Sequence, residues 1–138
     1  MTKKTIEIKA YKPHENEQYM NQSQLDFFRL ELLNHRQVLQ DEWESLNEEV
    51  HSSAELDSED FDKATRDVLL FSSVKRLEAI QRSLEAIDLA LSDIETGNYG
   101  FCKRTGKKIG LQRLFATPEA RFCIEEQEGV ELQQYEVA

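Results

Sequence analysis

The chain has 138 residues, enough for one domain or for a small globular part with an elongated attachment. Its 17 basic and 27 acidic residues give a formal net charge of -10, which disfavours direct binding to the phosphate backbone of DNA. No stretch is apolar enough for a membrane span or a signal segment, and two cysteines are too few for a secreted disulfide framework, so we expect a cytoplasmic protein.

The first sustained pattern in the chain is a helical heptad. Residues 1–20 have no hydrophobic period, so we expect an extended N-terminal arm there. From Ser23 apolar residues recur at heptad spacing, and the pattern resumes after a break at Ser52 and Ser53. Neither stretch has an interior Gly or Pro, so both are predicted to be helices of about 30 residues. The two seams consist of Leu25, Phe28, Leu32, His35, Leu39, Trp43, Leu46 and Val50, and of Leu70, Ser73, Leu77, Ile80, Leu84, Ile87, Leu91 and Ile94.

Two helices that each carry one apolar stripe bury those stripes most simply by folding back antiparallel. We therefore predict a coiled-coil hairpin over residues 21–96, with arms of about 45 Å. Its tip, residues 55–64, is acidic, because five of the eight residues from Glu55 to Asp62 are Asp or Glu. This run can be a solvated connection whose carboxylates stabilise the next helix N-terminus, or a contact surface for a basic or metal-bearing target, and both interpretations stay open.

A short irregular segment follows the hairpin. Gly97 takes the position that a helix C-cap favours and begins a turn. In residues 97–124, which we call the knob, we expect a hairpin-type turn at residues 104–108 and a helical turn at residues 111–116. Residues 125–138 have weak helical anchors and are predicted to form a C-terminal helix. The predicted fold is mainly α, a long antiparallel coiled-coil hairpin with a small globular knob and a C-terminal helix.

Short motifs of one known family recur along the chain in the family's order. They are Glu17–Asn21, Gly97–Cys102, Gly106, Ile109, Gly110, Leu114, Cys123 and Ile124. On these residues the chain resembles the DksA/TraR family over nearly its whole length, and the knob resembles that family's zinc finger. At the tip, Asp62, Lys63 and Ala64 resemble the family signature of Asp, a basic residue and Ala. Glu59 takes the place of the first tip aspartate, with the same charge and a longer side chain.

The resemblance implies a transcription regulator whose partner is bacterial RNA polymerase. The coiled coil is expected to enter the secondary channel of the polymerase and to alter initiation, with inhibition of ribosomal RNA promoters in the stringent response. The expected contacts near the polymerase active centre are Glu59, Asp62, Lys63 and Ala64, with Asp57 and Asp60 as secondary tip residues. We expect a monomer that binds neither DNA nor membranes and is not an enzyme.

The knob departs from the family at its metal site. A structural zinc takes four ligands, commonly from two Cys-x-x-Cys pairs. The corresponding positions here are Cys102, Thr105, Cys123 and Glu126. Because threonine is not a usual zinc ligand, we predict a degenerate, metal-free knob in which the cysteines pack as small apolar groups. The nearby basic residues Lys103, Arg104 and Lys107 are expected to form salt bridges there. Weak metal binding by two thiolates and one carboxylate, and a disulfide between the cysteines, stay open.

The site that binds the alarmone in the family has also lost most of its basic residues in this chain. The resemblance implies basic side chains that pair with the phosphates of guanosine tetraphosphate. The matching positions hold Ala86, Thr117 and Gln127, and only Arg113 keeps its charge. We therefore expect no zinc cofactor and weak or absent synergy with the alarmone, which stays possible as a co-regulator.

Two other functions stay open on the same scaffold. One is a coiled-coil interaction protein with a different partner. The other is an elongation factor similar to the Gre proteins, which also place acids at a coiled-coil tip, although the knob and the Asp62–Ala64 signature disfavour it.

Overall fold

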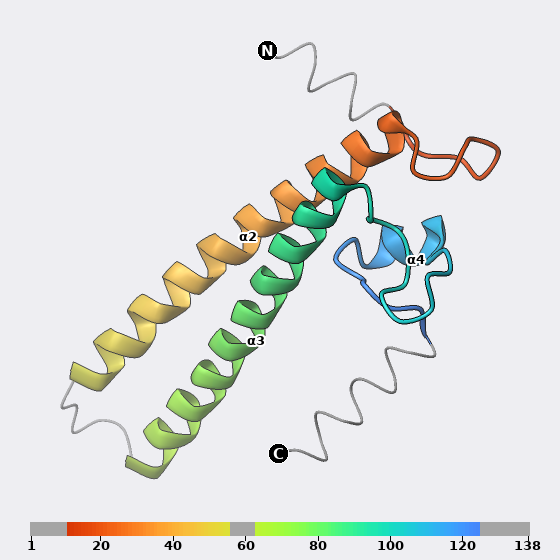
Figure 1. The fold of residues 1–138 in the computed structure, drawn as a ribbon. Coiled ribbons are helices and arrows are strands. Elements are labelled where there is room, and N and C mark those ends of the chain that lie inside the picture. The colour runs from red at the N-terminus through yellow and green to blue at the C-terminus, as the bar shows by residue number, and fades with distance from the viewer. Residues whose placement is uncertain (1–10, 56–62, 125–138) are drawn as a thin grey trace. The chain divides into compact units, whose positions relative to one another are not determined.

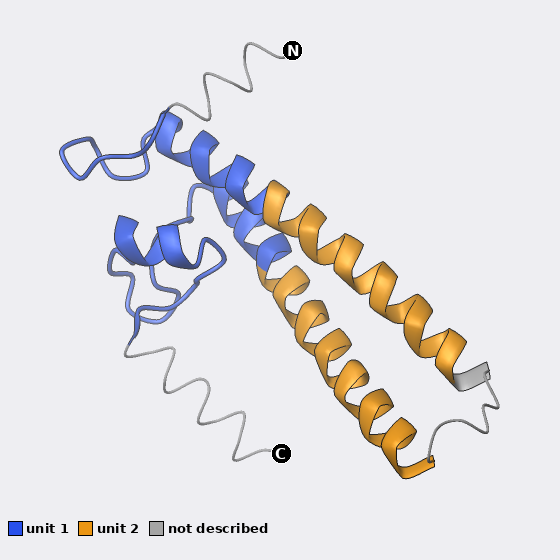
Figure 2. Cartoon of the chain, turned by 180° about the vertical axis from the view of Figure 1, so that it is seen from behind, with its two compact units in different colours: residues 1–33, 87–138 blue, residues 34–86 orange. Residues whose placement is uncertain are grey.

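A computed structural model describes residues 11–55 and 63–124 of the chain (Figure 1). These ranges contain the helices α2 (Gln22–Glu55), α3 (Lys63–Thr96) and α4 (Leu111–Ala116), and one isolated antiparallel bridge in place of any sheet. The chain divides into two compact units, one of residues 1–33 and 87–138 and one of residues 34–86, coloured separately in Figure 2. The predicted mainly α fold is confirmed, and the predicted C-terminal helix lies outside the described residues.

The predicted coiled-coil hairpin is also confirmed, because α2 and α3 run antiparallel (Figure 1) and seam residues of both helices are buried. Leu39 and Ile80 are buried within the unit of residues 34–86, at 7% and 0% exposure. Each helix has 34 residues, and α2 continues through Ser52 and Ser53, so the predicted break there is wrong. Serine costs an exposed helix only about 0.5 kcal/mol relative to alanine, which the flanking turns easily offset.

The start of α2 is fixed by a side-chain cap. The Asn21 side chain accepts the backbone N–H of Gln24 at 2.9 Å, and the buried Gln24 side chain accepts the N–H of Met20 at 2.8 Å. The Gln24 amide also donates to the carbonyl of His14 at 3.4 Å. Residues 11–20 therefore turn back toward α2, and the expectation of an extended arm is wrong for this part of it.

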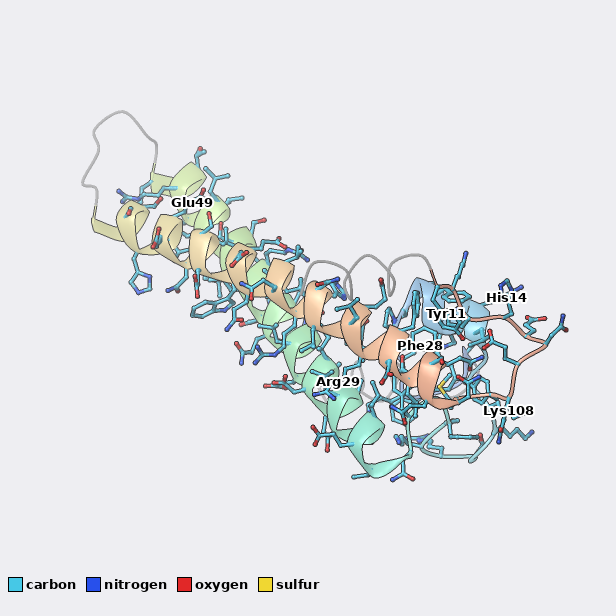
Figure 3. The ribbon with its side chains drawn as sticks, turned by 90° about the horizontal axis from the view of Figure 1, so that it is seen from above. Tyr11, His14, Phe28, Arg29, Glu49 and Lys108 are labelled. Atoms are coloured by element: carbon cyan, nitrogen blue, oxygen red, sulfur yellow. The ribbon has the colours of Figure 1, made fainter. Side chains whose placement is uncertain are left out.

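An aromatic cluster forms the core of the unit of residues 1–33 and 87–138. Phe28 of α2 is fully buried, with its ring centroid 5.6 Å from that of Tyr99 and 5.7 Å from that of Phe115. Figure 3 labels Phe28 and Tyr11 at this end of α2. Leu114 of α4 is also fully buried, which is why the predicted helical turn at residues 111–116 forms as an amphipathic helix.

Candidate functional site

The knob begins with the turn that ends α3. Gly97 has a φ of 81°, in the left-handed region that glycine tolerates, and the N–H of Asn98 donates to the carbonyl of Asp93 at 2.8 Å. An antiparallel bridge then pairs Phe101 with Lys108, and the N–H of Cys102 donates to the carbonyl of Lys107 at 2.8 Å. The predicted turn at Gly97 and the predicted hairpin-type turn at residues 104–108 are thus confirmed.

Tyr19 joins the arm to the knob, a contact that the sequence patterns did not predict. Its hydroxyl donates to the carbonyl of Gly100 at 2.6 Å and accepts the N–H of Gly110 at 3.0 Å. Burial raises the pKa of Tyr19, so the hydroxyl keeps its proton. Gly100 has a φ of 91°, and a Cβ there would lie 2.8 Å from the Cγ of Met20, so only glycine fits.

Cys102 and Cys123 are brought together, as the family's finger geometry implied. Their Sγ atoms lie 3.7 Å apart, and both thiols are free. Burial alone would raise the pKa of Cys102, but the Thr105 hydroxyl and the backbone amides of Cys123, Thr105 and Arg104 donate to its sulfur and lower the pKa to about 6. Thr105 therefore lies beside Cys102, and its hydroxyl donates a hydrogen bond that stabilises the Cys102 thiolate.

The side chains of the knob that could act as metal ligands do not fit a four-thiolate zinc site. The whole chain contains two cysteines, and a hydroxyl that donates to one of them stands in the place of a third. Within residues 11–55 and 63–124, no three His, Cys, Asp or Glu side chains gather closely enough to hold a metal ion. Glu126, the fourth position, lies outside the described residues.

An ionic cluster ties the knob to the end of α3. One oxygen of Asp93 lies 3.0 Å from the Lys103 ammonium and 3.5 Å from Nε of Arg121. The Lys103 ammonium also donates to the carbonyl of Asn98 at 3.1 Å, and its backbone N–H donates to the carbonyl of Arg121 at 2.9 Å. The prediction that basic residues of the knob form salt bridges is thus confirmed for Lys103, whereas the second base, Arg121, and the shared acid, Asp93, were not predicted.

The tip lies largely outside the described residues. This holds for Asp57, Glu59, Asp60 and Asp62. Lys63 and Ala64 are described, and both are exposed in the first turn of α3. Of the alarmone positions, Ala86 and Thr117 are half-buried, whereas Arg113 donates from Nε to the carbonyl of Phe122 at 3.1 Å. The one basic side chain retained from that set thus has a structural partner in the knob.

An antiparallel helix pair with a degenerate cysteine knob defines a recognisable class of protein. Residues 97–132 match the family model of the prokaryotic dksA/traR C4-type zinc finger. The chain is 33% identical over 127 residues to the RNA polymerase-binding transcription factor DksA of Caulobacter vibrioides, covering 89% of this chain and 87% of that protein. The chain therefore belongs to the DksA family.

Two further relatives extend the likeness to nearly the full chain. DksA of Escherichia coli strain K12, also named as an RNA polymerase-binding transcription factor, is 26% identical over 131 residues, covering 95% of this chain and 87% of that one. The solved structure of transcription factor DksA2 from Pseudomonas aeruginosa matches with a TM-score of 0.74 and 34% identity, covering 96% of this chain and 98% of that one. In the part of the chain that the structure describes, no helix is long and apolar enough to cross a membrane.

Proposed function

We propose that this chain binds RNA polymerase through the secondary channel and changes transcription initiation without contacting DNA. The observation that carries the proposal is similarity, over 89% and 95% of this chain, to two relatives named as RNA polymerase-binding transcription factors, on an antiparallel helix pair. The connection between the helices contains Asp57, Glu59, Asp60 and Asp62. Clustered carboxylates act on basic groups and metal ions, and a net charge of -10 disfavours a duplex as partner. In this role the chain is a cytoplasmic, non-catalytic monomer.

Within the tip, Glu59 and Asp62 carry the charge that acts near the polymerase active centre. Lys63 and Ala64 follow at the exposed start of α3, where the small Ala64 side chain permits close approach. Asp57 and Asp60 add to the local negative potential and contribute less.

Transcription from a ribosomal RNA promoter by purified bacterial RNA polymerase tests the proposal. The wild-type chain should inhibit, and Asp62→Asn should lose inhibition while it still binds the polymerase. Asp67→Asn is the matched control, because it removes an equal charge from an exposed position of α3. If the wild-type chain binds but has no effect on initiation, the proposal fails. Cleavage of the transcript in stalled complexes would point instead to an elongation factor.

We also infer that the knob keeps its fold without zinc, because buried contacts and the Asp93 ion pairs hold its segments together. The purified chain should contain less than about 0.1 zinc per molecule by mass spectrometry, far from the one ion per site of a structural zinc protein. A chelator should leave the midpoint of thermal unfolding unchanged. Stoichiometric zinc, or unfolding by the chelator, would contradict this inference.

Guanosine tetraphosphate should add little to the effect on transcription. Phosphate binding depends on charge-assisted hydrogen bonds from Arg or Lys, and Ala86 and Thr117 supply none. Inhibition measured with and without the nucleotide should differ by less than about twofold, which corresponds to about 0.4 kcal/mol of coupling. A larger gain would mean that other basic residues bind the nucleotide.

A further inference from the structure

The first half of α3 exposes large apolar side chains that lie outside its heptad seam. Val68, Phe71 and Val74 are 67%, 64% and 41% exposed, whereas Ile80 in the seam is fully buried. A single exposed apolar residue is ordinary on a protein surface. Three of them at intervals of one helical turn form a contiguous apolar patch, which is open to contact by a partner.

This patch continues toward the tip. Ala64, Val68, Phe71 and Lys75 follow one another at the four-three-four spacing of a single helix face, and we call them, with Val74, the outer stripe. The Lys75 ammonium lies 5.3 Å from the centre of the Phe71 ring and 3.8 Å from a carboxylate oxygen of Glu78. The stripe is thus an apolar strip with a polar border, and all of it lies within the unit of residues 34–86.

The size of the stripe argues against self-association. Its exposed apolar area is on the order of 300 Å², well below the roughly 800 Å² that each partner of a stable complex buries. A second copy of the chain held by this surface alone would not form a stable dimer. The stripe instead fits one edge of a larger interface, and it begins at Ala64, which directly follows the acidic segment proposed to act on RNA polymerase.

We propose that the outer stripe packs against an apolar wall of the RNA polymerase channel and supplies affinity, while the acidic tip supplies the effect on initiation. This proposal rests on the function proposed above. Aromatic and branched apolar side chains near the centre of an interface contribute strongly to binding, because their burial removes apolar surface from water. Loss of Phe71 or Val68 should therefore weaken binding and leave the tip chemistry intact.

The test is the dissociation constant of the full chain for purified bacterial RNA polymerase. Val68→Ser and Phe71→Ala should each bind about 10-fold more weakly than the wild type. Val38→Ser on α2 is the matched control, because Val38 is 64% exposed, and it should bind like the wild type. A photoreactive phenylalanine analogue at position 71, but not at position 38, should crosslink to the polymerase, which tests the contact without removing the ring.

The outcomes separate the two proposals. If the wild type binds and inhibits while Val68→Ser and Phe71→Ala bind equally well and position 71 gives no crosslink, the stripe proposal is wrong and the proposed function stands. If the wild type does not bind polymerase, both proposals fail. If a variant loses helical circular dichroism, the crosslink at position 71 decides.

Discussion

The two compact units of the chain bury their apolar side chains to different degrees. In the unit of residues 1–33 and 87–138, the fully buried side chains include Phe28 of α2, Ile87 of α3 and Leu114 of the knob. In the described part of residues 34–86, Leu39 and Ile80 are the buried apolar residues, while Val68 and Phe71 are mostly exposed. Burial of apolar area stabilises a fold, and its exposure leaves surface for a partner. We therefore expect the first unit to contribute more of the stability, whereas the second leaves more apolar surface open for the proposed recognition of a partner.

The largest expected difference between the units is in the loss of stability that a Phe→Ala substitution causes in each of them. Phe28→Ala should lower the free energy of unfolding by about 3–5 kcal/mol, because it leaves a cavity among Tyr99, Phe115 and the helices. Phe71→Ala removes the same atoms from a side chain that is 64% exposed and should cost less than about 1 kcal/mol. Urea unfolding of both variants measures the contrast. Equal losses would show that the two units do not differ in this way.

The next largest loss of stability should follow from breaking the ion pairs of the knob. Asp93→Asn removes the carboxylate charge that lies 3.0 Å from the Lys103 ammonium and 3.5 Å from Nε of Arg121, and a hydrogen bond to a charged group contributes about 2 kcal/mol. Glu95→Gln, an equal charge change at an exposed position of α3, should have almost no effect. Thermal unfolding should separate the two variants at neutral pH. If Asp93→Asn unfolds like the wild type, the cluster does not stabilise the knob.

The thiol of Cys102 gives an effect that depends on pH. Its pKa of about 6 lies below its ordinary value, so the thiolate stabilises the fold at high pH and this contribution is lost as pH falls through about 6. Thr105→Val removes the hydroxyl donor and should move the pKa of Cys102 back toward its ordinary value. Ultraviolet absorbance of the thiolate against pH, measured in a Cys123→Ser background, reports the shift. An unchanged titration would mean that the backbone amides alone hold the thiolate.

The periodic parts of the molecule were predicted well from sequence because each repeat is local. Heptad spacing indicated both helices and their mutual packing, and Gly97 marked the end of α3. The same approach failed at Ser52 and Ser53, where a weak helix propensity was taken for a break although neighbouring turns decide the outcome.

The contacts of the knob could not be predicted because they join distant, non-periodic residues. Tyr19 and Gly100 are 81 positions apart, and no spacing rule connects a turn residue to a carbonyl in another segment. The family resemblance indicated that Cys102 and Cys123 lie together but carried no information about Asp93. For the tip, composition indicated only a charged connection, and the roles of Glu59 and Asp62 came from the resemblance alone.

The smallest expected effect is at the exposed ion pair between α2 and α3. Arg76 donates to both carboxylate oxygens of Glu42, at 2.8 and 3.0 Å, but the side chains are 52% and 40% exposed. Solvent weakens such pairs, so a double-mutant cycle of Arg76→Ala and Glu42→Ala should give a coupling of about 0.5 kcal/mol.

A unit with two buried residues in its described part has few other contacts that hold its helices in register. Loss of the Arg76 pair should therefore speed amide hydrogen exchange in residues 34–86 before it changes exchange around Phe28. Glu48→Ala, which removes an exposed acid from the same helix as Glu42, is the control and should leave both regions unchanged. If exchange rises equally in the two units, they open together, and the division between a stable unit and a recognition unit does not hold.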